Sequence, residues 1–110
     1  MTVLMIRSGK RYAVRADVTL VAEEGKRAGL IIELSAEGCR ISNLGDTRYA
    51  IGEEVVVTTR RGRKLPGRIR WSHDNVAGVR FDAALHLDDL TGMVAACRGV
   101  SQEPQPRYGT

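Results

Sequence analysis

Apolar and polar residues alternate in short segments along most of the chain. In residues 16–22, Val18 and Leu20 fall on one face of an extended strand, and Asp17 and Thr19 fall on the other. Further short segments, bounded by Gly, Asn, Asp or Ser, predict five more strands at residues 30–34, 38–42, 55–59, 65–71 and 79–81. Six strands at hairpin spacing predict a mostly β chain that folds as a small antiparallel barrel.

The pattern changes near the C-terminal end, where the spacing of apolar residues becomes helical. The residues that recur at this spacing are Leu87, Leu90, Val94 and Cys97. They predict an amphipathic helix over residues 84–98, which Gly99 is placed to end. We therefore expect three parts: a flexible N-terminal arm (1–15), a barrel with a C-terminal helix (16–99) and a disordered tail (100–110).

Composition and charge narrow the class of protein. A chain of 110 residues suits one domain, and 17 basic against 13 acidic residues favour anionic partners. No apolar run approaches the ~20 residues of a membrane span, so we expect a soluble, cytoplasmic protein that does not insert into membranes. Cys39 and Cys97 form no CxxC pair, which predicts buried thiols in a reducing compartment.

The sequence contains no recognisable catalytic or metal-binding motif. His73 and His86 lack the spacing of a metal-binding pair, and no GxSxG, Walker A or GxGxxG motif is present. Asp88 and Asp89 lie near the predicted helix start, where the helix dipole explains acidic residues. We expect no catalytic activity, no metal and no cofactor.

Two short motifs carry the candidate chemistry. Arg11 and Arg15 form an RxxxR pattern immediately before the first predicted strand, and residues 33–38 read Glu-Leu-Ser-Ala-Glu-Gly between the second and third. With the strands at 68–71 (Arg-Ile-Arg-Trp) and 78–81 (Gly-Val-Arg-Phe), this set resembles the PilZ domain, a bacterial receptor for cyclic di-GMP. The family pattern is RxxxR followed by [D/N]xSxxG, and the resemblance covers roughly residues 7–98.

The resemblance implies a six-stranded barrel with a C-terminal helix and an arm that folds over cyclic di-GMP. It implies that the ligand-binding residues are Arg11, Arg15, Glu33, Ser35, Gly38 and Arg40, with Arg7 and Lys10 as accessory contacts. These residue types suit the ligand, because an arginine fork can pair with phosphate or with guanine O6 and N7. An acidic oxygen accepts from guanine N1 and N2, and glycine permits a close backbone approach or a positive φ.

Two departures from the family pattern leave alternatives open. Glu33 stands where the family has Asp or Asn, and its longer side chain is expected to weaken the site. Arg7 and Arg11 form a second RxxxR, although Arg15 runs directly into the first strand as the pattern requires.

Three functions remain. The first is a cyclic di-GMP receptor that orders its arm on binding and relays the signal to an unidentified effector protein. The second is a PilZ-like adaptor that does not bind the nucleotide, which Glu33 favours. The third is a nucleic-acid-binding barrel. The scarcity of aromatic residues argues against it, because the strands offer only Trp71 and Phe81 for base stacking.

Three further features have two interpretations each. Trp71 is expected to pack in the barrel rather than to form a stacking platform. Pro66 indicates either an edge strand or the start of a strand. The basic residues of 60–64 either blunt the pairing of an exposed strand edge or contact an acidic partner.

Overall fold

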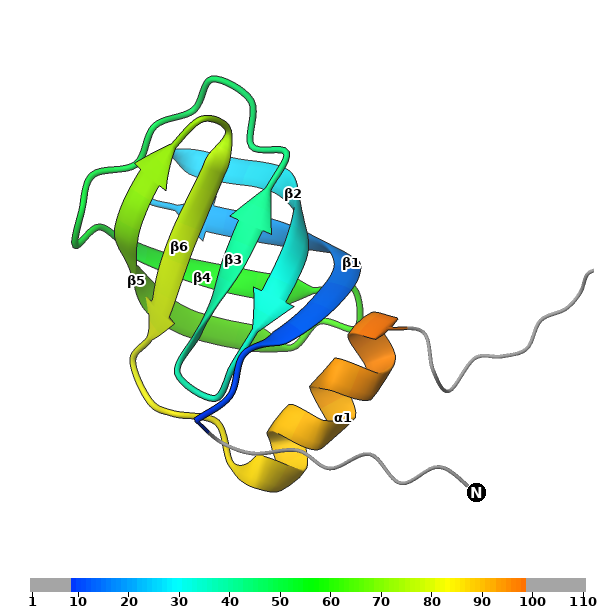
Figure 1. Ribbon diagram of the computed structural model, residues 1–110. Coiled ribbons are helices and arrows are strands. Elements are labelled where there is room, and N and C mark those ends of the chain that lie inside the picture. The colour runs from blue at the N-terminus through cyan, green and yellow to red at the C-terminus, as the bar shows by residue number, and fades with distance from the viewer. Residues whose placement is uncertain (1–8, 99–110) are drawn as a thin grey trace, which may run out of the picture.

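Six strands and one helix form the fold in the computed structural model, which describes residues 9–98. In chain order they are β1 (Tyr12–Ala22), β2 (Gly25–Leu34), β3 (Gly38–Ser42), β4 (Glu54–Thr59), β5 (Lys64–His73), β6 (Val76–Phe81) and α1 (Leu87–Arg98). All neighbouring strands are antiparallel, and the sheet closes in the order β1-β2-β3-β6-β5-β4 (Figure 1). The predicted six-stranded antiparallel barrel with a C-terminal helix is confirmed.

The alternating residues of the strands fill the inside of the barrel. In β1, Val18 and Leu20 are buried, whereas Asp17 is exposed. Burying one large aliphatic side chain stabilises the fold by about 1.5–3 kcal/mol. The largest fully buried side chains of the strands are Leu20, Ile31, Leu34, Ile41, Val57 and Ile69. Because these side chains occupy the interior, any ligand site must lie on the outer surface of the barrel or beside the helix.

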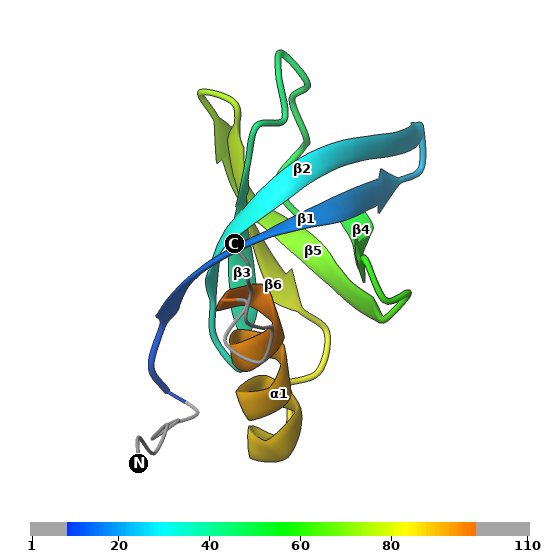
Figure 2. The same cartoon turned by 90° about the vertical axis from the view of Figure 1, so that its right-hand side faces the viewer.

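Helix α1 packs across one end of the barrel, against β1 (Figures 1 and 2). Its inward residues Leu90 and Val94 are fully buried. The helix begins at Leu87, three residues later than predicted. The reason lies in the preceding connection, where the N–H of Leu85 donates to the carbonyl of Ala36 at 2.8 Å. The chain is thus held against the β2–β3 turn until that point.

Strand β1 begins at Tyr12, four residues before the predicted start at Ala16. Tyr12 is 5% and Val14 is 8% exposed, so both continue the inward alternation, and Tyr12 pairs with Leu34 of β2. Arg15 therefore lies within a strand rather than in an arm. The beginning of the predicted arm (residues 1–8) and the predicted tail lie outside the described residues.

Two expectations about sheet edges are wrong. Strand β5 pairs with β4 on one side and β6 on the other, so Pro66 does not mark an edge strand; it is the third residue of β5. Residues 60–63 join β4 to β5, Lys64 is the first residue of β5, and both strands are paired on each side. A closed barrel has no edge for these basic residues to protect, and their contact with an acidic partner stays a prediction.

The two cysteines are buried free thiols, as predicted. Burial raises the pKa of the Cys97 thiol and raises the pKa of the Cys39 thiol further, which makes both poor nucleophiles. Within residues 9–98, no group of three His, Cys, Asp or Glu side chains is placed to hold a metal ion. In the same part of the chain, no helix has the length and apolar character needed to cross a membrane.

Candidate functional site

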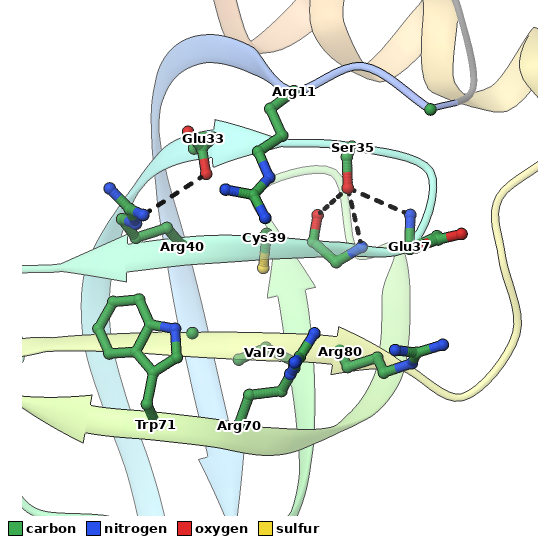
Figure 3. Close-up of a pocket in the computed structure, with 13 residues that line it drawn as sticks. Arg11, Glu33, Ser35, Glu37, Cys39, Arg40, Arg70, Trp71, Val79 and Arg80 are labelled. Atoms are coloured by element: carbon green, nitrogen blue, oxygen red, sulfur yellow. Dashed lines mark hydrogen bonds and ion pairs between the residues drawn. The ribbon is translucent and has the colours of Figure 1, made fainter.

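A small pocket lies on the outer face of the barrel, across β2, β3, β6 and β5 (Figure 3). Its volume is about 290 Å³. The charged side chains that line it are Arg11, Arg40, Arg70, Arg80, Glu33 and Glu37. Four guanidinium groups against two carboxylates leave an excess of positive charge, so the pocket suits an anionic ligand.

The strand register brings these side chains together from distant parts of the sequence. Gly38 of β3 lies opposite Arg80 of β6, and Arg40 lies opposite Gly78. On the other side of β6, Trp71 of β5 also lies opposite Gly78. Strands β3, β6 and β5 therefore carry the floor of the pocket, and Arg11 reaches over it from the start of β1 (Figure 3).

A bulge in β5 gives the pocket its aromatic wall. The register shifts between Ile69 and Trp71, so that β5 has one residue more than β6 at this point. Such a bulge re-aims side chains, and here the consecutive residues Arg70 and Trp71 both line the pocket. A Cβ at Gly78 would lie 2.4 Å from Trp71 Nε1, so only glycine lets the indole lie across β6.

Arg40 lies between an aromatic ring and a carboxylate. Its guanidinium carbon is 5.4 Å from the centroid of the Trp71 ring, within the range of a cation–π contact. Its Nη2 is 3.9 Å from Oε1 of Glu33. Its Nε is buried and has no hydrogen-bond partner among the described residues. A buried donor without a partner is costly, so a change in the position of the Arg40 side chain that gives Nε an acceptor would be favourable.

The turn between β2 and β3 is held by Ser35. Its Oγ accepts hydrogen bonds from the backbone N–H groups of Glu37 and Gly38, both at 3.2 Å. Gly38 is required by close packing, because a Cβ there would lie 2.2 Å from the carbonyl oxygen of Val79. Of the two reasons expected for this glycine, the structure shows close approach and not a positive φ. Ser35 and Gly38 thus shape the pocket wall.

Most of the predicted site residues line this one pocket, but Arg15 does not. Arg15 lines a separate groove beside α1. Lys10 is not among the pocket-lining residues, and its Nζ lies 5.6 Å from the centroid of the Tyr12 ring. Arg7 lies outside the described residues. The predicted residues that the structure does bring together are Arg11, Glu33, Ser35, Gly38 and Arg40.

The pocket residues that were not predicted as site residues include Arg70, Trp71 and Arg80. Trp71 was expected to pack in the barrel, but the bulge turns it to the outer face, where it is only partly buried. Arg70 and Arg80 stand at outward positions of strands that the motif comparison already included. Their alternation with buried Ile69 and Val79 was the signal that could have identified them.

The comparison with known proteins agrees with these motifs and this fold. A family model described as the PilZ domain matches residues 6–99. The chain belongs to the PilZ domain family. A solved PilZ structure, that of the PilZ domain of CeSA from a cellulose-synthesizing bacterium, has the same fold: its TM-score is 0.60 at 16% identity, and the alignment covers 84% of this chain and 99% of that one. No curated protein matches the sequence.

Members of the PilZ family are binding and adaptor domains rather than enzymes, and they are generally cyclic di-GMP receptors. The fold places this PilZ domain's positive pocket at the strands that carry the second motif, β2 and β3. The pocket is therefore the place to look for ligand binding.

Proposed function

We propose that this PilZ domain is a receptor that binds cyclic di-GMP in the outer pocket and relays binding to a protein partner. The observation that supports it is the convergence of four arginines on a pocket that also holds Trp71 and Glu33. Cyclic di-GMP offers two anionic phosphodiesters and two guanines, and these side chains complement both. A bacterial, cytoplasmic setting stays a prediction from the sequence.

Each part of the pocket suits one part of the ligand. The forks of Arg11, Arg70 and Arg80 suit the phosphate oxygens, which guanidinium groups bind bidentately. The exposed face of Arg40 and the Trp71 indole offer a planar surface for a guanine to stack on. Glu33 offers a carboxylate to the guanine N1 and N2 donors.

The size of the pocket supports a role for the N-terminal arm. At about 290 Å³ the pocket is at the lower limit of ordinary small-molecule sites, which span roughly 300–1,000 Å³. A ligand with two guanines would extend beyond it. We therefore propose that Arg11 and the residues before it close over the part of the ligand that the barrel leaves uncovered.

Arg15 needs a different role in this scheme. In the structure it lines the groove beside α1 and not the outer pocket. We assign the primary arginine contact to Arg11, and propose that Arg15 reaches the ligand only if the start of β1 shifts on binding. An Arg15→Ala variant that binds as tightly as the wild type would remove Arg15 from the site without affecting the role of Arg11.

Calorimetric titration of cyclic di-GMP into the purified protein tests the proposal. We expect saturable binding that weakens by about 30-fold or more in Arg11→Ala and in Arg40→Ala, since removing one partner of a buried charge pair costs ~2–5 kcal/mol. Arg48→Ala is the matched control, because Arg48 is exposed and lies outside both cavities. Its affinity should equal that of the wild type.

Absence of wild-type binding up to about 1 mM ligand, which corresponds to only about −4 kcal/mol, would reject the receptor function. The remaining function is then an adaptor that does not bind the nucleotide. A specific observation favours that second candidate: the Glu33 carboxylate lies 3.9 Å from Nη2 of Arg40, so the two charges partly neutralise each other without a ligand. A sharp gain of affinity in Glu33→Asp would show that this position limits binding.

A further inference from the structure

A second and larger concavity is lined by residues of α1, of the β4–β5 hairpin and of the adjoining strands β1 and β2. Its volume is about 1110 Å³, and it shares no lining residue with the outer pocket. Its floor is apolar. The floor residues are Val18, Ile31, Met93, Ala96 and Cys97. We call this concavity the helix groove.

The rim of the helix groove is rich in arginine. The rim arginines are Arg15, Arg60, Arg61, Arg63 and Arg98. Two of them are partly neutralised, since Arg60 lies 4.0 Å from Asp17 and Arg63 lies 3.4 Å from Asp89. For Arg15 and Arg61, no carboxylate within residues 9–98 comes within 4.0 Å. The rim therefore keeps positive charge that the described fold does not use.

We propose that the helix groove binds an acidic, amphipathic segment of a partner protein. The segment would place aliphatic side chains on the floor and carboxylates beside Arg15 and Arg61. This assigns a role to Arg60, Arg61 and Arg63 of the basic segment 60–64, which the closed barrel does not need for edge protection. The inference rests on the part of the proposed function that gives the domain a protein partner, and not on nucleotide binding.

The groove fits a peptide better than a nucleic acid. Base-binding surfaces generally offer aromatic side chains for stacking, and none of the described residues that line this groove is aromatic. Asp17, Asp88 and Asp89 lie in the same lining, and Asp17 and Asp89 are paired with Arg60 and Arg63, so the carboxylates of a peptide would lie beside Arg15 and Arg61 instead. An apolar floor with a charged rim is instead typical of a groove that binds an amphipathic peptide, because the floor can receive the apolar side chains from one face of a helix.

Gly92 provides a variant that blocks the groove without disturbing the core. It is exposed, lies in α1, lines the groove, and a Cβ placed on it meets no atom within 4 Å. Gly92→Trp would therefore project a large side chain into the groove. Arg61→Glu reverses the charge of an exposed rim residue, and Arg48→Glu is the matched charge reversal outside both cavities.

The test is selection from a displayed library of random peptides of about 15 residues, enough for about four helical turns. We expect enrichment of peptides that combine Asp or Glu with Leu, Ile, Val or Met. Their affinity should fall about tenfold or more in Gly92→Trp and in Arg61→Glu, stay unchanged in Arg48→Glu, and weaken as salt rises. Unfolding curves check that each variant is folded. If Gly92→Trp does not fold, Arg61→Glu alone tests whether the groove binds the peptides.

Several results would overturn the inference. They are no enrichment, enrichment of basic peptides, or enriched peptides that bind Arg61→Glu as tightly as the wild type. A (dT)15 oligonucleotide that binds the wild type and is lost in both groove variants would make the groove a nucleic-acid site instead. A wild-type dimer that dissociates in Gly92→Trp would make a second copy of the chain the occupant. Failure of cyclic di-GMP binding alone would leave the inference standing.

Discussion

At the scale of single residues, Gly38 is a position where both the sequence motif and the packing of the strands require glycine. A Cβ there would lie 2.2 Å from the carbonyl oxygen of Val79, and a backbone atom cannot move aside as a flexible side chain can. We expect Gly38→Ala to lower the free energy of unfolding by about 2–3 kcal/mol, in the range of overpacked cores. Urea-induced unfolding at equilibrium measures it.

Gly92→Ala is the control, because it makes the same chemical change in open space. In an exposed helix, replacing Gly by Ala raises the free energy of unfolding by up to about 1 kcal/mol. The two variants should therefore move in opposite directions. Equal stability of wild type and Gly38→Ala would show that β3 and β6 can separate at this point without cost.

The residues of the pocket fall into two groups: some are close together in the sequence, and others are far apart and meet only in the folded barrel. Glu33, Ser35, Gly38 and Arg40 lie within one hairpin, so a local motif predicts that they share a site. Arg80 joins them only through the pairing of β3 with β6, which are far apart in the sequence. No local pattern carries that pairing. The bulge that turns Trp71 outward is likewise a property of the register.

At the scale of elements, the strands were predictable but their ends were not. Short apolar segments and the turn residues between them are local signals, and they predicted all six strands. Strand β2, however, begins at Gly25 and not at residue 30, because its first four residues are exposed and pair with β1 through the backbone alone. Polar residues that extend a hairpin beyond the core leave no hydrophobic pattern to detect.

The contact between α1 and the start of β1 is an element-scale feature that can be tested. Arg98, the last residue of α1, donates from Nε to the carbonyl of Ala13 at 2.9 Å, and its guanidinium lies 5.9 Å from the Tyr12 ring centroid. We expect Arg98→Ala to lower the free energy of unfolding by about 1 kcal/mol, the value of one such bond. A thermal melt should show a decrease of roughly 4–8 °C.

Hydrogen exchange separates this contact from a general loss of stability. Amides at the start of β1 should exchange faster in Arg98→Ala, whereas those of β4 and β5 should change only as much as global stability does. Arg48→Ala again serves as the control. Unchanged exchange at Tyr12 and Ala13 would mean that Arg98 does not hold the start of β1.

At the scale of the whole molecule, the start of β1 runs between two cavities. Arg11 lines the outer pocket and Arg15 lines the helix groove, although the motif treats them as a pair. A register shift between Ala13 and Ala16 lies within this stretch. Spacing along the chain could not reveal the separation, because it depends on where α1 packs.

This arrangement predicts that the two proposed ligands affect each other. Each would contact the start of β1, and a segment ordered by one ligand costs less entropy to order for the other. We expect saturating cyclic di-GMP to raise the affinity for a groove-binding acidic peptide by about fivefold or more, a coupling of at least about 1 kcal/mol. Titration of the peptide with and without nucleotide measures the change.

Linkage requires the reciprocal effect, so the peptide must raise the affinity for cyclic di-GMP by the same factor. Arg98→Ala should reduce the coupling, since Arg98 ties α1 to Tyr12 and Ala13. If both ligands bind and neither changes the affinity of the other, the start of β1 is equally ordered in every state. The domain would then relay the nucleotide signal through another surface.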